Sequence, residues 1–279
     1  MSATLEYLRP KTLDEALTLL RRPGMRTVPL AGGAWLVPRL RGDVDVPEPL
    51  EEPVDAVVDL ADLGLSFIEL EGQPGDGSLR LGATTTLEQM ADSAVCRQLA
   101  SGILAQAAQR EAPINQRNAA TVAGAVLGAP SQSELLLALL ALAAHAVVNA
   151  GQPRAVPLNE LLADLPGQLG GGLVTEIKLP WPAETARGGL ARVARTPTDQ
   201  PIVAAAALVG GDSRRVVVGG VTSAPLLLRL EAGVDLEPVL DAALEDVPML
   251  SDWQGSDEYR RAMALVLGRR ALEQASGAA

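Results

Sequence analysis

The sequence predicts an α+β protein whose last third differs in character from the rest. Up to about residue 176, short apolar segments with helical or strand periodicity alternate, and glycine-rich or proline-rich turns separate them. From residue 177 onward, two strands are followed by two helices, which is typical of a separate domain of antiparallel strands and helices. We therefore expect domain boundaries that divide the chain into residues 1–53, 54–176 and 177–279.

The first 53 residues predict a helix, a strand and a glycine turn. Thr12 followed by Glu15 is typical of a capping box, and a Pro-Gly pair at 23–24 ends the helix. Residues 27–30 predict a strand that continues into a small-residue turn at 31–33. Such a turn can present backbone N–H groups to an anion.

The middle of the chain predicts a second set of elements. Residues 114–133 show little periodicity and are too polar and rich in glycine to belong to a core. The other expected elements are a strand at 56–60, a hairpin of 66–70 with 79–83, a short helix capped by Thr86, a helix at 97–110, an apolar helix at 133–144, and strands at 146–149 and 173–179.

The last third predicts strands at 202–209 and 214–221, the second rich in valine. Helices at 236–244 and 257–275 are expected to follow them.

Composition excludes several classes of function. A net charge of −11 leaves no basic surplus to neutralise phosphates, so we expect no nucleic-acid partner. Cys96 and His145 are the only cysteine and histidine, which excludes an iron–sulfur cluster or a structural zinc site within this chain. His145 stands in an apolar stretch and is expected to be a packed or partly exposed residue between a helix and a strand.

The sequence also favours a soluble cytoplasmic protein. Its first residues are acidic and lack the apolar segment of a signal peptide. The longest apolar run, from Leu135 to Val148, is too short to cross a bilayer, so no membrane association is expected.

Several short motifs occur in a specific order along nearly the whole chain. They are Leu30-Ala31-Gly32-Gly33, Leu81-Gly82-Ala83-Thr84-Thr85, Arg117-Asn118-Ala119-Ala120-Thr121-Val122-Ala123-Gly124, Ser133-Glu134-Leu135 and Arg269-Arg270-Ala271-Leu272. In these motifs the chain resembles the FAD-binding medium subunit of the molybdenum hydroxylases, the family of carbon monoxide dehydrogenase and bacterial xanthine dehydrogenase. The resemblance implies a two-lobed PCMH-type FAD-binding domain, with its subdomains at 1–53 and 54–176, followed by the C-terminal domain.

The same resemblance implies a cofactor site for FAD built from two glycine turns. Glycine-rich turns can approach a pyrophosphate closely because they lack Cβ atoms. It also places residues 199–203 loosely near the isoalloxazine ring. From the residues themselves, no side chain stands out as an acid–base catalyst, and we expect no metal ligand in this chain. The expected cofactor-binding residues are Ala31, Gly32, Gly33, Ala34, Trp35, Leu36, Thr85, Asn118, Thr121, Ala123, Gly124, Ala125 and Glu134.

The resemblance further implies two partners, a small subunit with [2Fe–2S] clusters and a large subunit that contains molybdopterin. Electrons would pass from molybdenum through the clusters to FAD, and then to NAD, a quinone or another acceptor. The substrate of such a complex would be chosen by the large subunit.

Both turns depart from the family pattern. Trp35 stands where small polar residues are usual, Ala123 and Ala125 replace a glycine and an asparagine, and Glu134 replaces an aspartate. Each lost side-chain hydrogen bond to a phosphate would cost about 1.5–3 kcal/mol, whereas backbone donors survive any side-chain change. Two alternatives therefore stay open beside the flavoprotein: a flavin-free structural or interaction subunit, and a protein that binds another nucleotide-like ligand.

Overall fold

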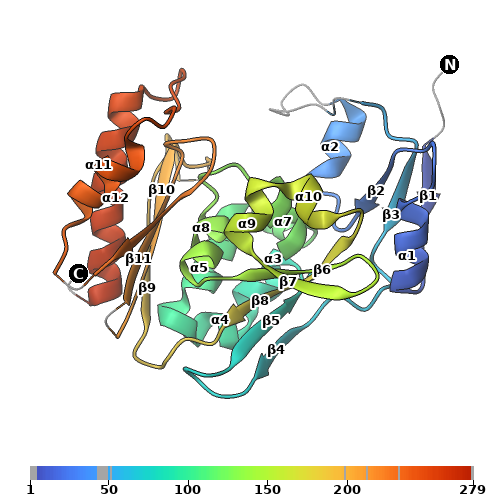
Figure 1. The fold of residues 1–279 in the computed structure, drawn as a ribbon, viewed down its shortest axis with the longest axis horizontal. Helices are drawn as coiled ribbons and strands as arrows, with labels where there is room; N and C mark the ends of the chain where they lie inside the picture. Colours follow the sequence, from blue (N-terminus) through green and yellow to red (C-terminus); the bar gives the residue numbers. More distant parts are fainter. Residues whose placement is uncertain are drawn as a thin grey trace.

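The computed structural model describes residues 5–42, 50, 52–197, 199–211, 213–231 and 233–277. Its strands form three separate sheets, each built from a different part of the chain (Figure 1). Helices accompany every sheet, and the α+β fold class is confirmed.

The first sheet is parallel, with the strand order β1-β3-β2. The side-chain oxygen of Thr12 accepts from the Glu15 N–H at the start of the first helix, as predicted. The Glu15 carboxylate accepts from the N–H of Lys11 instead of Thr12, so the second half of the capping box is displaced by one residue. The elements of this unit are β1 (Glu6–Leu8), α1 (Leu13–Leu20), β2 (Thr27–Leu30), α2 (Leu36–Arg41) and β3 (Ala56–Asp59).

The second sheet is antiparallel, with the strand order β4-β5-β8-β6-β7. Its elements are β4 (Ile68–Glu71), β5 (Ser78–Gly82), α3 (Leu87–Asp92), α4 (Ala94–Gln98), η1 (Leu99–Gly102), α5 (Ile103–Glu111), α6 (Ile114–Arg117), α7 (Val122–Gly128), α8 (Glu134–Ala141), β6 (His145–Asn149), β7 (Pro153–Pro157), α9 (Leu158–Ala163), α10 (Leu165–Leu169) and β8 (Leu173–Pro180).

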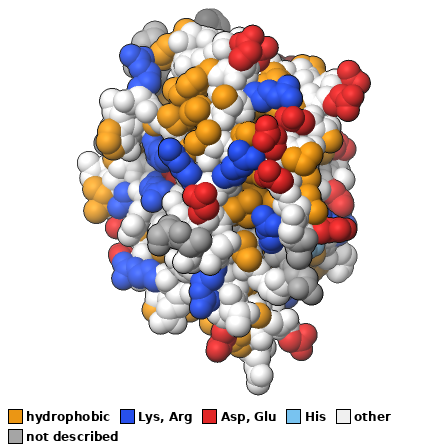
Figure 2. All heavy atoms as spheres, turned by 90° about the vertical axis from the view of Figure 1, so that its left-hand side faces the viewer, with side chains coloured by type: hydrophobic (Ala, Val, Ile, Leu, Met, Phe, Trp, Pro, Cys, Tyr) orange, Lys and Arg blue, Asp and Glu red, His pale blue; other side chains and the backbone are white. Residues whose placement is uncertain are grey.

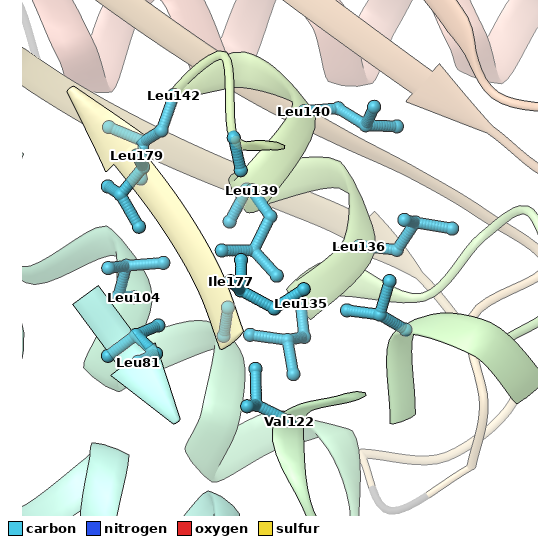
Figure 3. Close-up of a cluster of buried hydrophobic side chains, with 14 of the residues drawn as sticks. Leu81, Leu104, Val122, Leu135, Leu136, Leu139, Leu140, Leu142, Ile177 and Leu179 are labelled. Carbon is cyan, nitrogen blue, oxygen red and sulfur yellow. The ribbon is translucent and has the colours of Figure 1, made fainter. Parts of the chain in front are cut away.

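The largest hydrophobic core lies between this sheet and its helices. Every residue of α8 is buried, and Leu135 and Leu139 face Ile177 of β8 (Figure 3). Val122, the first residue of α7, points into the same cluster. Because leucine predominates in this core, burial of aliphatic side chains is its main source of stability, at about 1.5–3 kcal/mol for each.

Two predictions for this unit were wrong. The helix expected at 97–110 is interrupted, because Ala100, Ser101 and Gly102 have φ values of 46°, 62° and 75°. This kink places the Ala100 carbonyl against β9, where a Cβ on Gly188 would lie 2.7 Å from the Ala100 oxygen. The segment 114–133 was expected to stay out of the core, yet it forms α6 and α7, and α7 buries apolar side chains. Here the few apolar residues outweigh the glycines around them.

The third sheet is antiparallel, with the order β12-β11-β10-β9, and it is covered on both faces. Ala204 and Ala206 of β10 pack into the main core beneath α8, whereas Ala205 and Ala207 face α12. Small side chains at these alternating positions let both helices approach the strand closely. The elements are β9 (Arg187–Val193), β10 (Val203–Gly210), β11 (Ser213–Gly219), β12 (Leu226–Leu230), α11 (Leu236–Leu244) and α12 (Asp257–Ser276).

The outer face of α11 and α12 is charged. Figure 2 shows acidic and basic side chains mixed with hydrophobic ones on this side of the molecule. Arg261 pairs with Asp241, and Arg269 pairs with Asp235 and Glu237, which joins the two helices. None of the described helices is both long and apolar enough to span a membrane.

The single cysteine and the single histidine have structural environments. Cys96 is fully buried, and burial raises the pKa of its thiol to about 11, so the thiol is neutral and unreactive. His145 opens β6 and is half-buried, with Nδ1 3.1 Å from the Ala143 carbonyl oxygen. This position confirms the sequence interpretation of His145.

Candidate cofactor site

Two turns from different parts of the chain press against each other. The first turn, residues 31–35, follows β2, and the second turn, residues 118–125, runs into the start of α7. A Cβ on Gly32 would lie only 1.5 Å from the Ala119 carbonyl oxygen. Gly32 is therefore required for the contact, while Gly33 is required for its left-handed backbone, with φ at 72°.

The first turn has free backbone donors. In the part of the chain that the structure describes, the N–H groups of Gly32, Gly33, Ala34 and Trp35 donate to no acceptor. Gly32, Ala34 and Trp35 are exposed, so a ligand can reach these donors. Successive amides of this kind suit an oxyanion such as a phosphate.

The second turn differs, because most of its amides already donate to acceptors within the chain. Val122 donates to the Thr85 carbonyl over 2.8 Å, and Ala123 donates to the Ala83 carbonyl over 3.2 Å. The Gly124 N–H donates to the Thr121 hydroxyl over 3.3 Å, which caps α7. The two turns were expected to bind together. Among the described residues, however, four successive amides are free in the first turn, whereas every amide from Val122 to Ala125 has an acceptor within the chain.

The polar side chains expected at the site also bond within the chain. The Thr85 hydroxyl is buried and exchanges hydrogen bonds with the backbone of Phe67. The Asn118 side chain is exposed and donates to the Ile114 carbonyl over 3.0 Å. The Thr85 contacts tie residue 85 to Phe67, the Asn118 contact stabilises the second turn, and Asn118 is the more accessible of the two side chains.

The alanine substitutions in the second turn cause no strain. Ala123 has no positive φ, so its Cβ is tolerated without cost. Ala123 is buried in the main core, and Ala125 is partly buried against it. A polar asparagine at 125 would therefore face an apolar surface in this protein.

Trp35 packs within the chain, between the first turn and α7. A Cβ on Gly128 would lie 2.5 Å from two atoms of the indole, so Gly128 provides the surface on which Trp35 rests. The Arg39 guanidinium lies 3.0 Å from the ring centroid, and its Nη1 donates to the Trp35 carbonyl over 2.9 Å. The indole keeps 37% of its surface exposed, and it connects α2 to α7.

Glu134 is the first residue of α8, and none of the described hydrogen bonds or ion pairs joins its side chain to the first turn. Its carboxylate is only 2% exposed and pairs with Arg110 over 3.1 Å and with Arg192 over 2.9 Å. Of the expected site residues, the structure places Gly32 against residue 119 and Thr85 beside the start of α7, and it pairs Glu134 with two arginines.

Sequence reasoning missed the residues that complete these contacts. Gly128, Arg110 and Arg192 lie outside the motifs, and Ala119 lies within one but was not among the expected site residues. Their roles arise only from tertiary contact. Gly128 gave no usable signal, because it is the last residue of α7, where a glycine is common, and the sequence predicted no helix there.

This arrangement fits a diphosphate better than a catalytic centre. Free amides and a close approach between the turns suit an anionic linker, and no side chain in the turns is placed as an acid or base. Among the described residues, no three potential metal ligands gather at one point.

Comparison with known proteins agrees with this geometry. Residues 3–182 match the protein family described as the FAD binding domain in molybdopterin dehydrogenase. The chain is 29% identical to the carbon monoxide dehydrogenase medium chain of Afipia carboxidovorans, covering 99% of this chain and 98% of that protein. It is 27% identical to the alpha subunit of the 6-hydroxypseudooxynicotine dehydrogenase complex of Paenarthrobacter nicotinovorans, covering 98% of this chain and 94% of that protein.

The fold is shared with a solved relative. A chain of the reconstituted CO dehydrogenase from Oligotropha carboxidovorans superimposes with a TM-score of 0.82 at 25% identity, and 100% of both chains is covered.

Proposed function

The chain belongs to the family of FAD-binding domains in molybdopterin dehydrogenases, with FAD as its cofactor, and we propose that it is the electron-transfer subunit of a molybdenum hydroxylase complex. The observation that carries this proposal is the first turn. Four successive N–H groups there are free within the described chain, at the position where the family motif predicts the pyrophosphate.

The residues of this chain would bind and orient the cofactor. The amides of residues 32–35 would donate to the pyrophosphate oxygens, and Gly32 lets the first turn sit directly on the second. When bound, FAD supplies the redox chemistry, accepting electrons from a donor and passing them to an acceptor. The core beneath Val122 and the cap from Thr121 would keep the supporting turn rigid.

We also propose the partners that the family relationship suggests, a [2Fe–2S] small subunit and a molybdopterin-containing large subunit. The relatives named above are described as a medium chain and as one subunit of a complex. Copurification of an iron–sulfur protein with the tagged chain from its native host would support this assembly. Recovery of the chain alone from an extract that contains both candidate subunits would contradict it.

FAD binding is the direct test. We expect the full-length chain to bind FAD with a dissociation constant of about 1 μM or tighter, measured by quenching of flavin fluorescence. ADP should compete because it carries the same diphosphate, whereas FMN should compete poorly. Saturable binding of ADP without binding of FAD would instead favour another nucleotide-like ligand.

A flavin-free structural subunit is the second candidate function. It is favoured by the second turn, whose amides from Val122 to Ala125 all have acceptors within the chain. Absence of any saturable FAD or ADP binding by the folded chain, together with recovery of the partner subunits, would establish this candidate in place of the first.

Trp35 tests whether packing has replaced polar contacts at the first turn. The sequence alone predicts that Trp35→Ser raises FAD affinity by restoring a hydroxyl group. The contacts with Gly128 and Arg39 lead us to expect the opposite, a loss of roughly tenfold, because a loosened turn must be ordered on binding. Titration calorimetry with FAD measures the change.

Two further variants test whether the effect depends on the packing of the Trp35 indole against Gly128. Gly128→Ala would push the indole away and should weaken FAD binding to a similar degree, with a shift in tryptophan fluorescence. Trp253→Ser is the control, since Trp253 is 77% exposed and lies between α11 and α12. A gain in affinity for Trp35→Ser would show that the indole obstructs the site.

A further inference from the structure

Glu134 connects two parts of the chain through a buried ion pair. It is the first residue of α8, where Ser133 caps the helix and a negative charge is favoured by the helix dipole. Its Oε2 atom accepts from Arg192 of β9, and its Oε1 atom accepts from Arg110 of α5. Arg192 belongs to the third sheet, whereas Glu134 and Arg110 belong to the central unit.

Arg192 also holds the segment that follows β9. We call this segment the β9–β10 loop and describe it over residues 194–197 and 199–202. The second guanidinium nitrogen of Arg192 donates to the Asp199 carbonyl. The Asp199 carboxylate in turn accepts from the Thr196 N–H over 3.1 Å. One arginine therefore joins Glu134 to this loop.

Neighbouring contacts also join the central unit to the third sheet. The Ser131 hydroxyl donates to the Thr222 carbonyl over 2.9 Å and accepts from the Gly220 N–H over 3.2 Å. A Cβ on Gly219 would lie 1.9 Å from the Ser131 carbonyl oxygen. The stretch that leads from α7 to α8 is thus fixed against the end of β11.

Glu111, a second acidic residue beside α8, has another role. Burial raises the pKa of the Glu111 carboxyl, and the side chain accepts from the Leu135 N–H over 3.2 Å. Glu111 thus helps to cap α8, and Glu134 is the carboxylate that pairs with both arginines. Glu111, Glu134, Gln200 and Pro201 line a cavity of about 10 Å³, so little space remains beside the ion pair.

We propose that Glu134 is a positioning residue instead of a direct cofactor ligand, and that its carboxylate locks Arg192 and the β9–β10 loop onto the start of α8. With 2% of its surface exposed and both oxygens engaged, Glu134 acts through its partners. The lock adds to the packing of β10 against α8, which already joins the C-terminal sheet to the central unit, and it does not depend on a bound cofactor.

Limited digestion of the full-length, cofactor-free chain with trypsin tests the lock. Arg195 is exposed in the β9–β10 loop, so cleavage after it reports release of the loop and yields a fragment beginning at residue 196. We expect Glu134→Gln and Arg192→Gln each to speed this cleavage by roughly tenfold, measured by mass spectrometry under conditions where the chain stays folded. The double variant should cleave no faster than either single variant, because both remove one interaction.

Two control variants make the test specific. Arg110→Gln removes the partner that lies in the central unit and should leave the cleavage rate within about twofold. Glu176→Gln removes a comparably buried carboxylate that pairs with Arg80 inside the central sheet, and should also leave it unchanged. The proposal is overturned if Glu134→Gln cleaves at the wild-type rate, if Glu176→Gln accelerates cleavage equally, or if the two single effects multiply.

The link to the cofactor is a separate measurement that rests on the proposed function. If Glu134 acts through Arg192, both glutamine variants should change FAD affinity by the same factor. A loss confined to Glu134→Gln would identify a direct ligand and overturn the positioning role. Because the digestion uses no cofactor, its outcome remains decisive even if the chain binds no FAD.

Discussion

Gly32→Ala is expected to lower FAD affinity by at least 100-fold, equivalent to about 2.7 kcal/mol. The added Cβ would lie 1.5 Å from the Ala119 carbonyl oxygen, far inside any tolerated contact. Backbone atoms occupy both sides of this contact, so neither can rotate away as a flexible side chain would. The first turn must separate from the second, and its amides then lose their common orientation. Flavin fluorescence titration of the folded variant measures the loss.

Gly24→Ala is the matched control for this prediction. Gly24 has a φ of 73°, and a Cβ added there would meet nothing within 4 Å, so the substitution costs about 1–2 kcal/mol of backbone strain without a collision. It should lower stability slightly and leave FAD affinity unchanged. An affinity for Gly32→Ala close to that of Gly24→Ala would show that contact between the turns is not needed for binding.

The sequence predicted the elements whose signals are local. The helix after Thr12, the apolar helix beginning near residue 133 and the hairpin before Thr86 each have a cap, a strong periodicity or a glycine turn, and all three form. Four strands were missed, and β1, with only three residues, is the shortest of them. β7 begins and ends with proline, which an edge strand tolerates, and β9 contains two adjacent glycines. β12 is a short apolar run in which periodicity alone does not separate strand from helix.

The glycines of β9 show why such an element cannot be read locally. A Cβ on Gly189 would lie 2.1 Å from the Ala271 carbonyl oxygen of α12, and one on Gly188 would meet the kink near Ala100. Both glycines are selected by close tertiary contact, and they weaken the strand pattern that would reveal them. The candidate site shows the same limit. The glycine turn at residues 31–33 was predictable from the sequence, but the packing of the Trp35 indole against Gly128 was not.

Arg260→Leu is expected to destabilise the protein by about 3 kcal/mol or more, because several buried acceptors would lose their donor. Arg260 is only 2% exposed, on α12. Its guanidinium donates to the carbonyls of Ile202 over 2.9 Å, Gly220 over 2.7 Å and Gly255 over 3.2 Å. These bonds join α12 to β10, to the end of β11 and to the turn before the helix. Urea denaturation followed by circular dichroism measures the change.

Arg261→Leu provides the comparison at the next position of the same helix. Arg261 and Asp241 are about half exposed, and such surface pairs contribute at most about 1 kcal/mol to stability.

The pH dependence of stability gives a second way to distinguish the two variants. Arg260 lowers the pKa of the Asp252 carboxyl, so this pairing stabilises the fold above the ordinary carboxyl pKa and is lost on acidification. Arg260→Leu should therefore weaken the acid dependence of stability, whereas Arg261→Leu should retain it. Equal losses of stability in the two variants would contradict the role of Arg260 as the buried donor that joins α12 to the third sheet.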